Sequence, residues 1–415
     1  MASLLGKYKK VELHIRYFIV AEFLIQMINA AFMAILLIFM SKQGYSDAES
    51  AKFISFRFLS VLLLAFPFGL YIKGRKMKPF FIISSLLTPL TSILIVFAIK
   101  WHADALLSVL LFIWGVSFIG IQISALPYII RNAKPETHTE AISLSFSTWS
   151  LGGIVSGFLI FGLSKISPEY FTEDKLLILI SSLGFLSYYF VSKIKYKENV
   201  VLQNPNPWDL KAFDWSKIFQ ALIPTFIIAI GAGLTIPFIS LFFYKIHGID
   251  SNQFALLSAI TTILVFTSVL FVPVIKEKLG YKKAIPTTQF SAILALVILA
   301  FTEIIPYSWA VYLAIACYIL RQPLMNLAGP MTSDVVMQYV GDKNRDIYSA
   351  LTSAIWSGSW FVSSKIFQIL RDSNISYMNI FLITAGLYSI GVIAYMRLIN
   401  LYERQNSSKI SSASN

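Results

Sequence analysis

The sequence predicts an all-α integral membrane protein with twelve transmembrane helices in two pseudo-symmetric six-helix bundles. The chain of 415 residues is 57% hydrophobic and only 13% charged, and its mean hydropathy is +0.70. Soluble proteins carry about 25% charged residues, so a soluble enzyme or a nucleic-acid-binding protein is a poor interpretation. The apolar residues form long runs without the alternation of strands, and the two halves of the chain share residues at corresponding positions.

Twelve apolar runs are long enough to cross a bilayer, which takes about 20 residues per helix. Because lipid offers no hydrogen-bond partner to backbone groups, each run is expected to form a helix. The predicted spans cover residues 17–40, 48–71, 79–99, 105–130, 140–164, 175–194, 218–243, 252–275, 284–304, 308–333, 347–370 and 377–400.

Basic residues predict the orientation of these spans. Most of the 34 Lys and Arg residues lie in the N-terminal segment, in the loops after even-numbered spans and near the C-terminus. Because cytoplasmic loops carry an excess of Lys and Arg, we expect a multi-pass protein of the plasma or inner membrane with both termini in the cytoplasm. The net charge of +13 then faces anionic headgroups, so the partner is the lipid bilayer and not nucleic acid.

A long polar stretch with two Asn-Pro pairs, which favour turns, divides the chain. We expect an N-terminal six-helix bundle at residues 1–192 and a cytoplasmic linker at 193–217. A C-terminal six-helix bundle then covers residues 218–400, and a polar cytoplasmic tail covers 401–415.

The two halves resemble each other along the sequence. Gly44 and Gly248 are 204 positions apart, as are Phe39 and Phe243, and the Trp-Ser pair at 149–150 recurs at 356–357. Such matches at nearly one offset predict a duplicated unit. Duplicated halves are a recurring plan of secondary transporters, in which the substrate site lies near the bilayer midplane.

The loop between spans 8 and 9 presents a turn residue, an acid, a base, a glycine and two further bases in order: Pro273, Glu277, Lys278, Gly280, Lys282 and Lys283. This order resembles the cytoplasmic loop signature of the major facilitator superfamily, with Pro273 where glycine is usual. Gly69 matches the start of the same signature after span 2, although Lys73 and Gly74 replace its acid and base. The resemblance implies two bundles, alternating access and closure of the cytoplasmic side by these loops. It also implies that Glu277 holds the outward-facing state through contacts with neighbouring helices.

Polar side chains inside the spans mark candidate sites, because a charged one costs about 2.5–3.5 kcal/mol on insertion scales. In the first span, Glu22, Gln26 and Asn29 share one helix face. This face predicts either the wall of a central cavity with Glu22 as proton carrier, or packing amides beside a Glu22 that reaches the cytoplasmic surface. Gln122 in the fourth span is a further cavity candidate.

Two arginines lie well inside spans. Arg57 lies about 14 Å into the second span, where Glu22 is the expected partner of an ion pair that serves either substrate or structure. Arg321 lies about 18 Å into the tenth span, together with Gln322 and Asn326. It predicts either contact with an anionic substrate group or a guanidinium that binds nearby backbone carbonyls.

Residues in three further spans could serve either the substrate path or helix packing. In the eleventh, Trp356 and Trp360 are one turn apart and predict either stacking on a substrate or ordinary packing. The small-residue face of the fifth span, which includes Ser145 and Gly152, favours close helix packing. Pro237 in the seventh predicts either a partly unwound segment or a simple kink.

Together these features predict a transporter of a small-molecule substrate by alternating access, secondary active or facilitative, with protons as the candidate coupling ion. An exporter or flippase of amphipathic compounds or lipids is the first alternative, and a non-transporting membrane receptor is the second. The chain has neither the phosphate motif GxxxxGK(S/T) nor a His/Cys cluster. We therefore expect no enzymatic activity, no cofactor and no metal site, and we expect a monomer.

Overall fold

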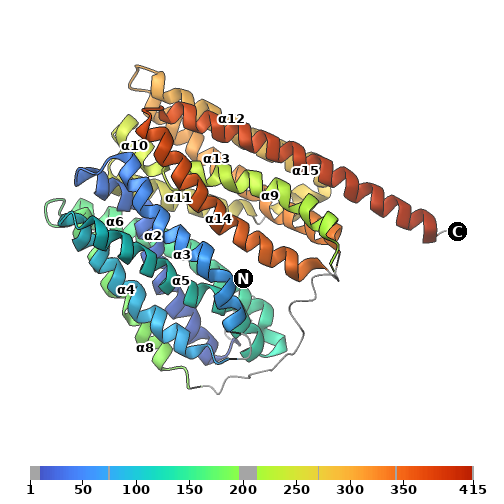
Figure 1. The fold of residues 1–415 in the computed structure, drawn as a ribbon, viewed down its shortest axis with the longest axis horizontal. Helices are drawn as coiled ribbons and strands as arrows, with labels where there is room; N and C mark the ends of the chain where they lie inside the picture. Colours follow the sequence, from blue (N-terminus) through green and yellow to red (C-terminus); the bar gives the residue numbers. More distant parts are fainter. Residues whose placement is uncertain (1–9, 73–74, 196–212, 270, 342–343, 414–415) are drawn as a thin grey trace. The chain divides into compact units, whose positions relative to one another are not determined.

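The computed structural model describes residues 10–72, 75–195, 213–269, 271–341 and 344–413, and within these ranges the regular elements are all helical (Figure 1). The first half contains α2 (Leu13–Lys42), α3 (Asp47–Tyr71), α4 (Lys78–Lys100), α5 (Asp104–Asn132), η1 (Pro135–Thr137), α6 (His138–Ile166), α7 (Glu173–Gly184) and α8 (Leu186–Ser192). The second half contains α9 (Trp215–Thr235), α10 (Ile239–His247), α11 (Ser251–Val269), α12 (Val272–Phe301), η3 (Thr302–Ile304), α13 (Ala310–Val340), α14 (Arg345–Asp372) and α15 (Tyr377–Ala413).

These helices confirm the predicted all-α membrane fold. Eleven segments of the described ranges are long and apolar enough to cross a membrane. The predicted span at residues 347–370 is the 28-residue helix α14, whose many serines and Lys365 lower its apolar character. The predicted linker falls largely on residues 196–212, which lie outside the described residues.

Several predicted spans are interrupted or extended. The seventh is divided into α9 and α10 by a turn that contains Pro237, since proline has no N–H to continue the helix. The sixth is divided into α7 and α8 at Phe185. Gly280 breaks α12 with a φ of 63°, a left-handed conformation that costs glycine little because it has no Cβ. The last helix, α15, continues to Ala413, so most of the predicted tail is helical.

Close packing divides the chain into two units. Unit 1 comprises Met1–Pro205 and Phe243–Ala259, and unit 2 comprises Asn206–Phe242 and Ile260–Asn415. In unit 1, α2 packs on α6, α7 and α8, and α4 packs on α5. In unit 2, α9 packs on α14 and α15, and α12 packs on α13. Corresponding helices thus have corresponding neighbours, as expected for a duplicated unit, while the domain boundaries at 192 and 218 stay a prediction.

The repeat extends to local backbone conformation. Gly44, which follows α2, has a φ of 91°, and Gly248, which follows α10, has a φ of 65°. No heavy atom would lie within 4 Å of a Cβ at either position. Since L side chains disfavour positive φ, backbone geometry alone explains why glycine stands at both matching positions.

An ion cluster joins residues 243–259 to the rest of unit 1. The Nζ of Lys42, at the end of α2, lies 2.5 Å from a carboxylate oxygen of Glu173 and 2.5 Å from one of Asp250. Ser251 donates a hydrogen bond to Glu173. These contacts connect the end of α2 and the start of α7 with the start of α11.

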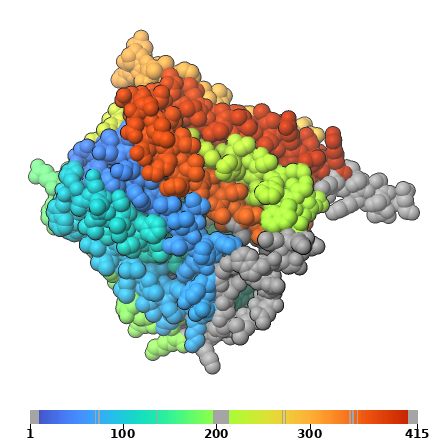
Figure 2. All heavy atoms as spheres, viewed as in Figure 1, coloured from blue at the N-terminus to red at the C-terminus, as the bar shows by residue number. Residues whose placement is uncertain are grey.

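Apolar side chains cover the outer faces of the helices. On α4, part of the light-blue surface of unit 1 in Figure 2, Ile83, Leu86, Leu90 and Leu94 are exposed. Their spacing of three and four residues forms one helical stripe. Exposed apolar stripes of this kind suit contact with hydrocarbon.

Candidate functional site

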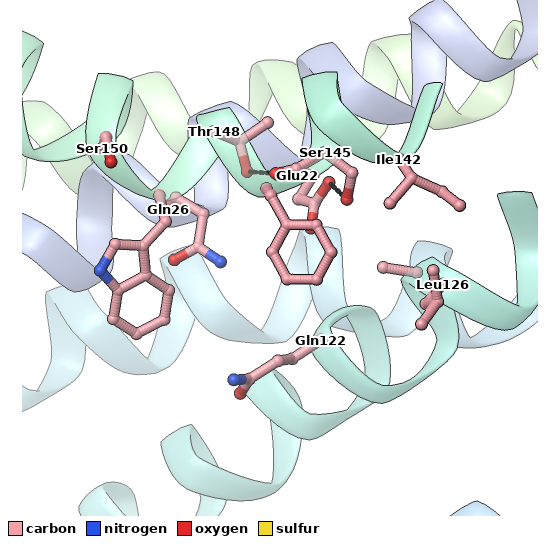
Figure 3. Close-up of a pocket in the computed structure, with 11 residues that line it drawn as sticks. Glu22, Gln26, Gln122, Leu126, Ile142, Ser145, Thr148 and Ser150 are labelled. Carbon is pink, nitrogen blue, oxygen red and sulfur yellow. Dashed lines mark hydrogen bonds between the residues drawn. The ribbon is translucent and has the colours of Figure 1, made fainter. Parts of the chain in front are cut away.

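A cavity of about 280 Å³ lies within unit 1, between α2, α5 and α6 (Figure 3). Three of the predicted site residues meet there: Glu22 and Gln26 from α2, and Gln122 from α5. The fifth predicted span, now α6, supplies a larger share of the wall. The lining is completed by Ala125, Leu126, Ile142, Ser145, Phe146, Thr148, Trp149 and Ser150.

Glu22 is the one ionisable side chain among the residues that line this cavity. It is 6% exposed and accepts a hydrogen bond of 2.7 Å from the Oγ of Ser145. Thr148 donates to the backbone oxygen of Ser145 at 2.6 Å, and Figure 3 shows both contacts on the same wall. The hydroxyl protons of Ser145 and Thr148 are therefore both used in hydrogen bonds within the protein.

The two glutamines differ in burial. Gln26 is 4% exposed, and its Oε1 has no hydrogen-bond partner in the described structure. Gln122 is exposed, and Figure 3 shows its amide across the cavity from α6. A buried unpaired acceptor costs about 1–3 kcal/mol, so the Oε1 of Gln26 is a local cost in this wall.

A close approach of two helix backbones positions this wall. A Cβ at Gly152 of α6 would lie 2.9 Å from the carbonyl carbon of Gln26 and 3.0 Å from the backbone nitrogen of Met27. Only glycine permits this spacing, and Ser145 lies two turns away on the same helix. The small-residue face of the fifth span therefore serves packing, as expected, and also brings Ser145 to Glu22.

Arg57 does not form the expected pair with Glu22. The ion pairs of the described residues include none between them. Arg57 is 7% exposed and donates to the Oδ1 of Asn29 and, at 3.1 Å, to the Sδ of Met33. Its guanidinium carbon lies 4.3 Å from the ring centre of Trp114. Asn29 thus faces Arg57 and not the cavity, because it lies on the side of α2 that meets α3.

Arg321, in unit 2, has uncharged partners. It is 1% exposed and donates to the Oη of Tyr388 at 3.4 Å and to the Oε1 of Gln322 at 3.5 Å. Asn326 is exposed and donates to the backbone oxygen of Gln322 at 2.8 Å. No ion pair of the described residues involves Arg321, so both candidate interpretations of this arginine stay open.

The tryptophans of α14 lie outside the cavity of unit 1. Trp356 is 38% exposed and Trp360 is half-buried. The Cα of Trp360 would lie 3.2 Å from a Cβ at Gly233 of α9. This contact gives Trp360 a packing role between α9 and α14, and its predicted substrate contact stays a prediction.

The motif between the eighth and ninth predicted spans folds as the first part of α12, with the break at Gly280. Glu277 and Lys278 are exposed and form no hydrogen bond or ion pair among the described residues. The Nζ of the neighbouring Lys276 instead lies 2.8 Å from the Oδ2 of Asp334 at the end of α13. The same oxygen accepts a hydrogen bond from Tyr281.

The other residues of the motif make fewer contacts. Lys282 lies 3.5 Å from Glu403 of α15, and Lys283 is exposed. Gly69, at the start of the corresponding first-half motif, lies within α3. The motif's acid is Glu277, and its role in holding the outward-facing state stays a prediction. The network formed by Asp334 was missed because its partners are 58 and 53 positions away in sequence.

Comparisons with known proteins agree with this architecture. The sequence model of the Major Facilitator Superfamily matches residues 18–364. No curated protein matches the chain. A solved structure of the nucleoside transporter NupG superimposes with a TM-score of 0.71 at 15% identity, over 93% of this chain and 98% of that one.

Two further solved structures share the fold. A bacterial homologue of the iron transporter ferroportin, in an inward-facing state, has a TM-score of 0.73 at 13% identity, over 93% of this chain and 98% of that one. A bacterial homologue of the human lysosomal transporter Spinster has a TM-score of 0.70 at 12% identity, over 94% and 97%. With a family match over most of its length, this chain belongs to the major facilitator superfamily of membrane transporters.

Proposed function

We propose that the protein moves a small solute across the plasma or inner membrane by alternating access, with Glu22 as the carrier of a coupling proton. The observation that carries this proposal is the Glu22 carboxyl, buried in the wall of the unit 1 cavity and hydrogen-bonded to Ser145. Acidic side chains inside spans commonly mark proton relays and substrate pathways. When Glu22 gains or loses a proton, the charge of the cavity changes with it.

The basic loops support an orientation with both termini in the cytoplasm. In this proposal, residues 1–192 and 218–400 are the two bundles, and residues 69–78 and 273–283 close the cytoplasmic side. The contacts of Asp334 with Lys276 and Tyr281 tie the second of these segments to α13. Since the cavity is built within one chain, a monomer suffices.

An exporter or flippase of amphipathic compounds is the second candidate function. Two large aromatic side chains that line the cavity, Phe146 and Trp149, are 71% and 54% exposed. Exposed apolar surface at a cavity suits a substrate with an apolar body. This candidate keeps the same site and differs in substrate and direction.

Transport by reconstituted protein tests the proposal. Solutes that stabilise the purified protein are added outside protein-containing liposomes, and their uptake is followed with and without a pH gradient. We expect gradient-driven accumulation, which Glu22→Gln abolishes while exchange of labelled for unlabelled solute persists at saturating solute. Glu140→Gln, on α6 but outside the cavity lining, is the matched control and should behave like the unmodified protein.

Two results would overturn the proposal. Unchanged gradient dependence in Glu22→Gln would remove this carboxyl from coupling. If no stabilising solute crosses the liposome membrane under any gradient, the protein is not a transporter of these solutes, and a receptor becomes the better interpretation.

A further inference from the structure

We infer that the cavity of unit 1 accepts a small organic cation, with an ammonium group on Glu22 and an aromatic or aliphatic body against Trp149 and Phe146. This inference rests on the proposed function, because it names the substrate class of the same cavity. It is carried by the chemistry of the described lining residues, which include a carboxyl group and aromatic faces but no Lys, Arg or His.

Charge is the first argument. Glu22 lines the cavity, and among the residues that the structure describes no Lys, Arg or His lines it. The guanidinium of Arg57, the buried cation nearest in sequence, is directed to Asn29, Met33 and Trp114. In its ionised form, a carboxyl without a basic neighbour attracts a cation and repels an anion. The lining therefore does not suit an anionic substrate group.

The balance of donors and acceptors is the second argument. The hydroxyls of Ser145 and Thr148 already donate to Glu22 and to the backbone. The Oε1 of Gln26 is buried without a partner. An ammonium group has up to three N–H donors and no acceptor. It can therefore donate to the Glu22 carboxylate, beside the N–H groups that Gln26, Gln122 and Trp149 contribute to the lining.

The aromatic wall is the third argument. Trp149 follows Thr148 directly in α6, and both line the cavity. Indole is the strongest of the natural cation–π faces, with a contribution of about 0.5–1 kcal/mol at exposed sites and about 2 kcal/mol or more when desolvated. The volume of about 280 Å³ is near the lower end of ligand pockets, which begin at about 300 Å³. A small aromatic amine fits these limits.

Binding of three probes of similar shape tests this inference. The probes are 2-phenylethylammonium, the neutral 2-phenylethanol and the anionic 3-phenylpropanoate, titrated calorimetrically into purified protein at neutral pH without any gradient. We expect the ammonium to bind at least tenfold more tightly than the other two. Glu22→Gln should weaken the ammonium at least tenfold and leave the alcohol unchanged.

Further variants keep the result interpretable if Glu22→Gln folds poorly. Glu22→Asp keeps the charge and should retain part of the preference for the ammonium. Trp149→Leu should weaken the ammonium several-fold, and Trp149→Phe should weaken it less. Glu140→Gln is the control for an acid outside the cavity. Equal binding of the three probes, tighter binding of the anion, or binding by none of them would overturn the inference.

The two proposals fail separately. If the ammonium binds through Glu22 but does not cross liposome membranes under any gradient, the transport proposal fails and the cation site stands. If another solute is driven by protons in a Glu22-dependent way while the ammonium does not bind, the cation inference fails and the transport proposal stands.

Discussion

Replacement of Gly152 by alanine tests whether the close approach of α6 to α2 builds the cavity. The new Cβ would lie 2.9 Å from the carbonyl carbon of Gln26. Carbon atoms in contact prefer separations of about 3.5–4.0 Å, so the two helices would have to separate by roughly 0.5–1 Å. Because the blocking atoms are backbone, no side chain can rotate away to relieve the contact.

We expect a loss of about 1–3 kcal/mol, which is typical of overpacking in a well-packed interior. The separation also draws Ser145 away from Glu22, since Ser145 lies two turns from Gly152 on the same helix. The Gly152→Ala protein should therefore show a lower thermal unfolding midpoint, followed by tryptophan fluorescence. It should also show weaker solute transport in liposomes.

Gly162→Ala is the matched control on the same helix. No heavy atom lies within 4 Å of a Cβ at Gly162, so alanine meets nothing there. Alanine is preferred to glycine inside a helix by about 0.5–1 kcal/mol, and the control should be as stable as the unmodified protein or slightly more stable. The reasoning is refuted if Gly152→Ala keeps the original midpoint, or if Gly162→Ala loses as much stability.

Three further predictions concern the polar contacts. A double-mutant cycle of Arg57→Met and Trp114→Leu should show a coupling of about 2 kcal/mol in unfolding, the strength of a desolvated cation–π contact, and strictly additive effects would contradict the contact. Asp334→Asn should lower stability by up to about 1 kcal/mol, since its ion pair is partly exposed, whereas Glu277→Gln should leave the unfolding midpoint unchanged; equal effects of the two would be inconsistent with the network. Burial raises the pKa of Glu12, but hydrogen bonds from its own backbone and from the segment between α5 and α6 outweigh it, so the pKa lies below 4.5. The ionised Glu12 therefore stabilises the fold above about pH 4.5, and this stabilisation is lost as the pH falls through the lowered pKa of Glu12 in the folded protein. Glu12→Gln should flatten this part of the profile of stability against pH, measured down to about pH 3.

Much of the fold follows from local properties of the chain. Long apolar runs must become helices, because lipid leaves backbone groups no other hydrogen-bond partner. The positive φ shared by Gly44 and Gly248 follows directly from the repeat. The interruption of the seventh span follows from Pro237. Each of these features depends on the chain near the residue concerned.

The candidate site was only partly predictable. The sequence placed Glu22, Gln26 and Asn29 on one face of a helix, and the structure divides that face between two neighbours. Glu22 and Gln26 meet α6 at the cavity, whereas Asn29 turns to Arg57 on α3. Helical spacing fixes which residues share a face, but it does not fix which helix packs against each part of it.

The sequence by itself thus determined the helical spans and their duplication, because these depend on hydropathy and on residues close together in the chain. Only the tertiary structure decided that Glu22 pairs with Ser145 and not with Arg57, and that the acid that binds Lys276 and Tyr281 is Asp334 of α13. The physical reason is that the rotation of each helix about its axis and the distance between packed helices decide which side chains meet. That geometry is set by contacts such as Gly152 against Gln26, between residues far apart in the sequence.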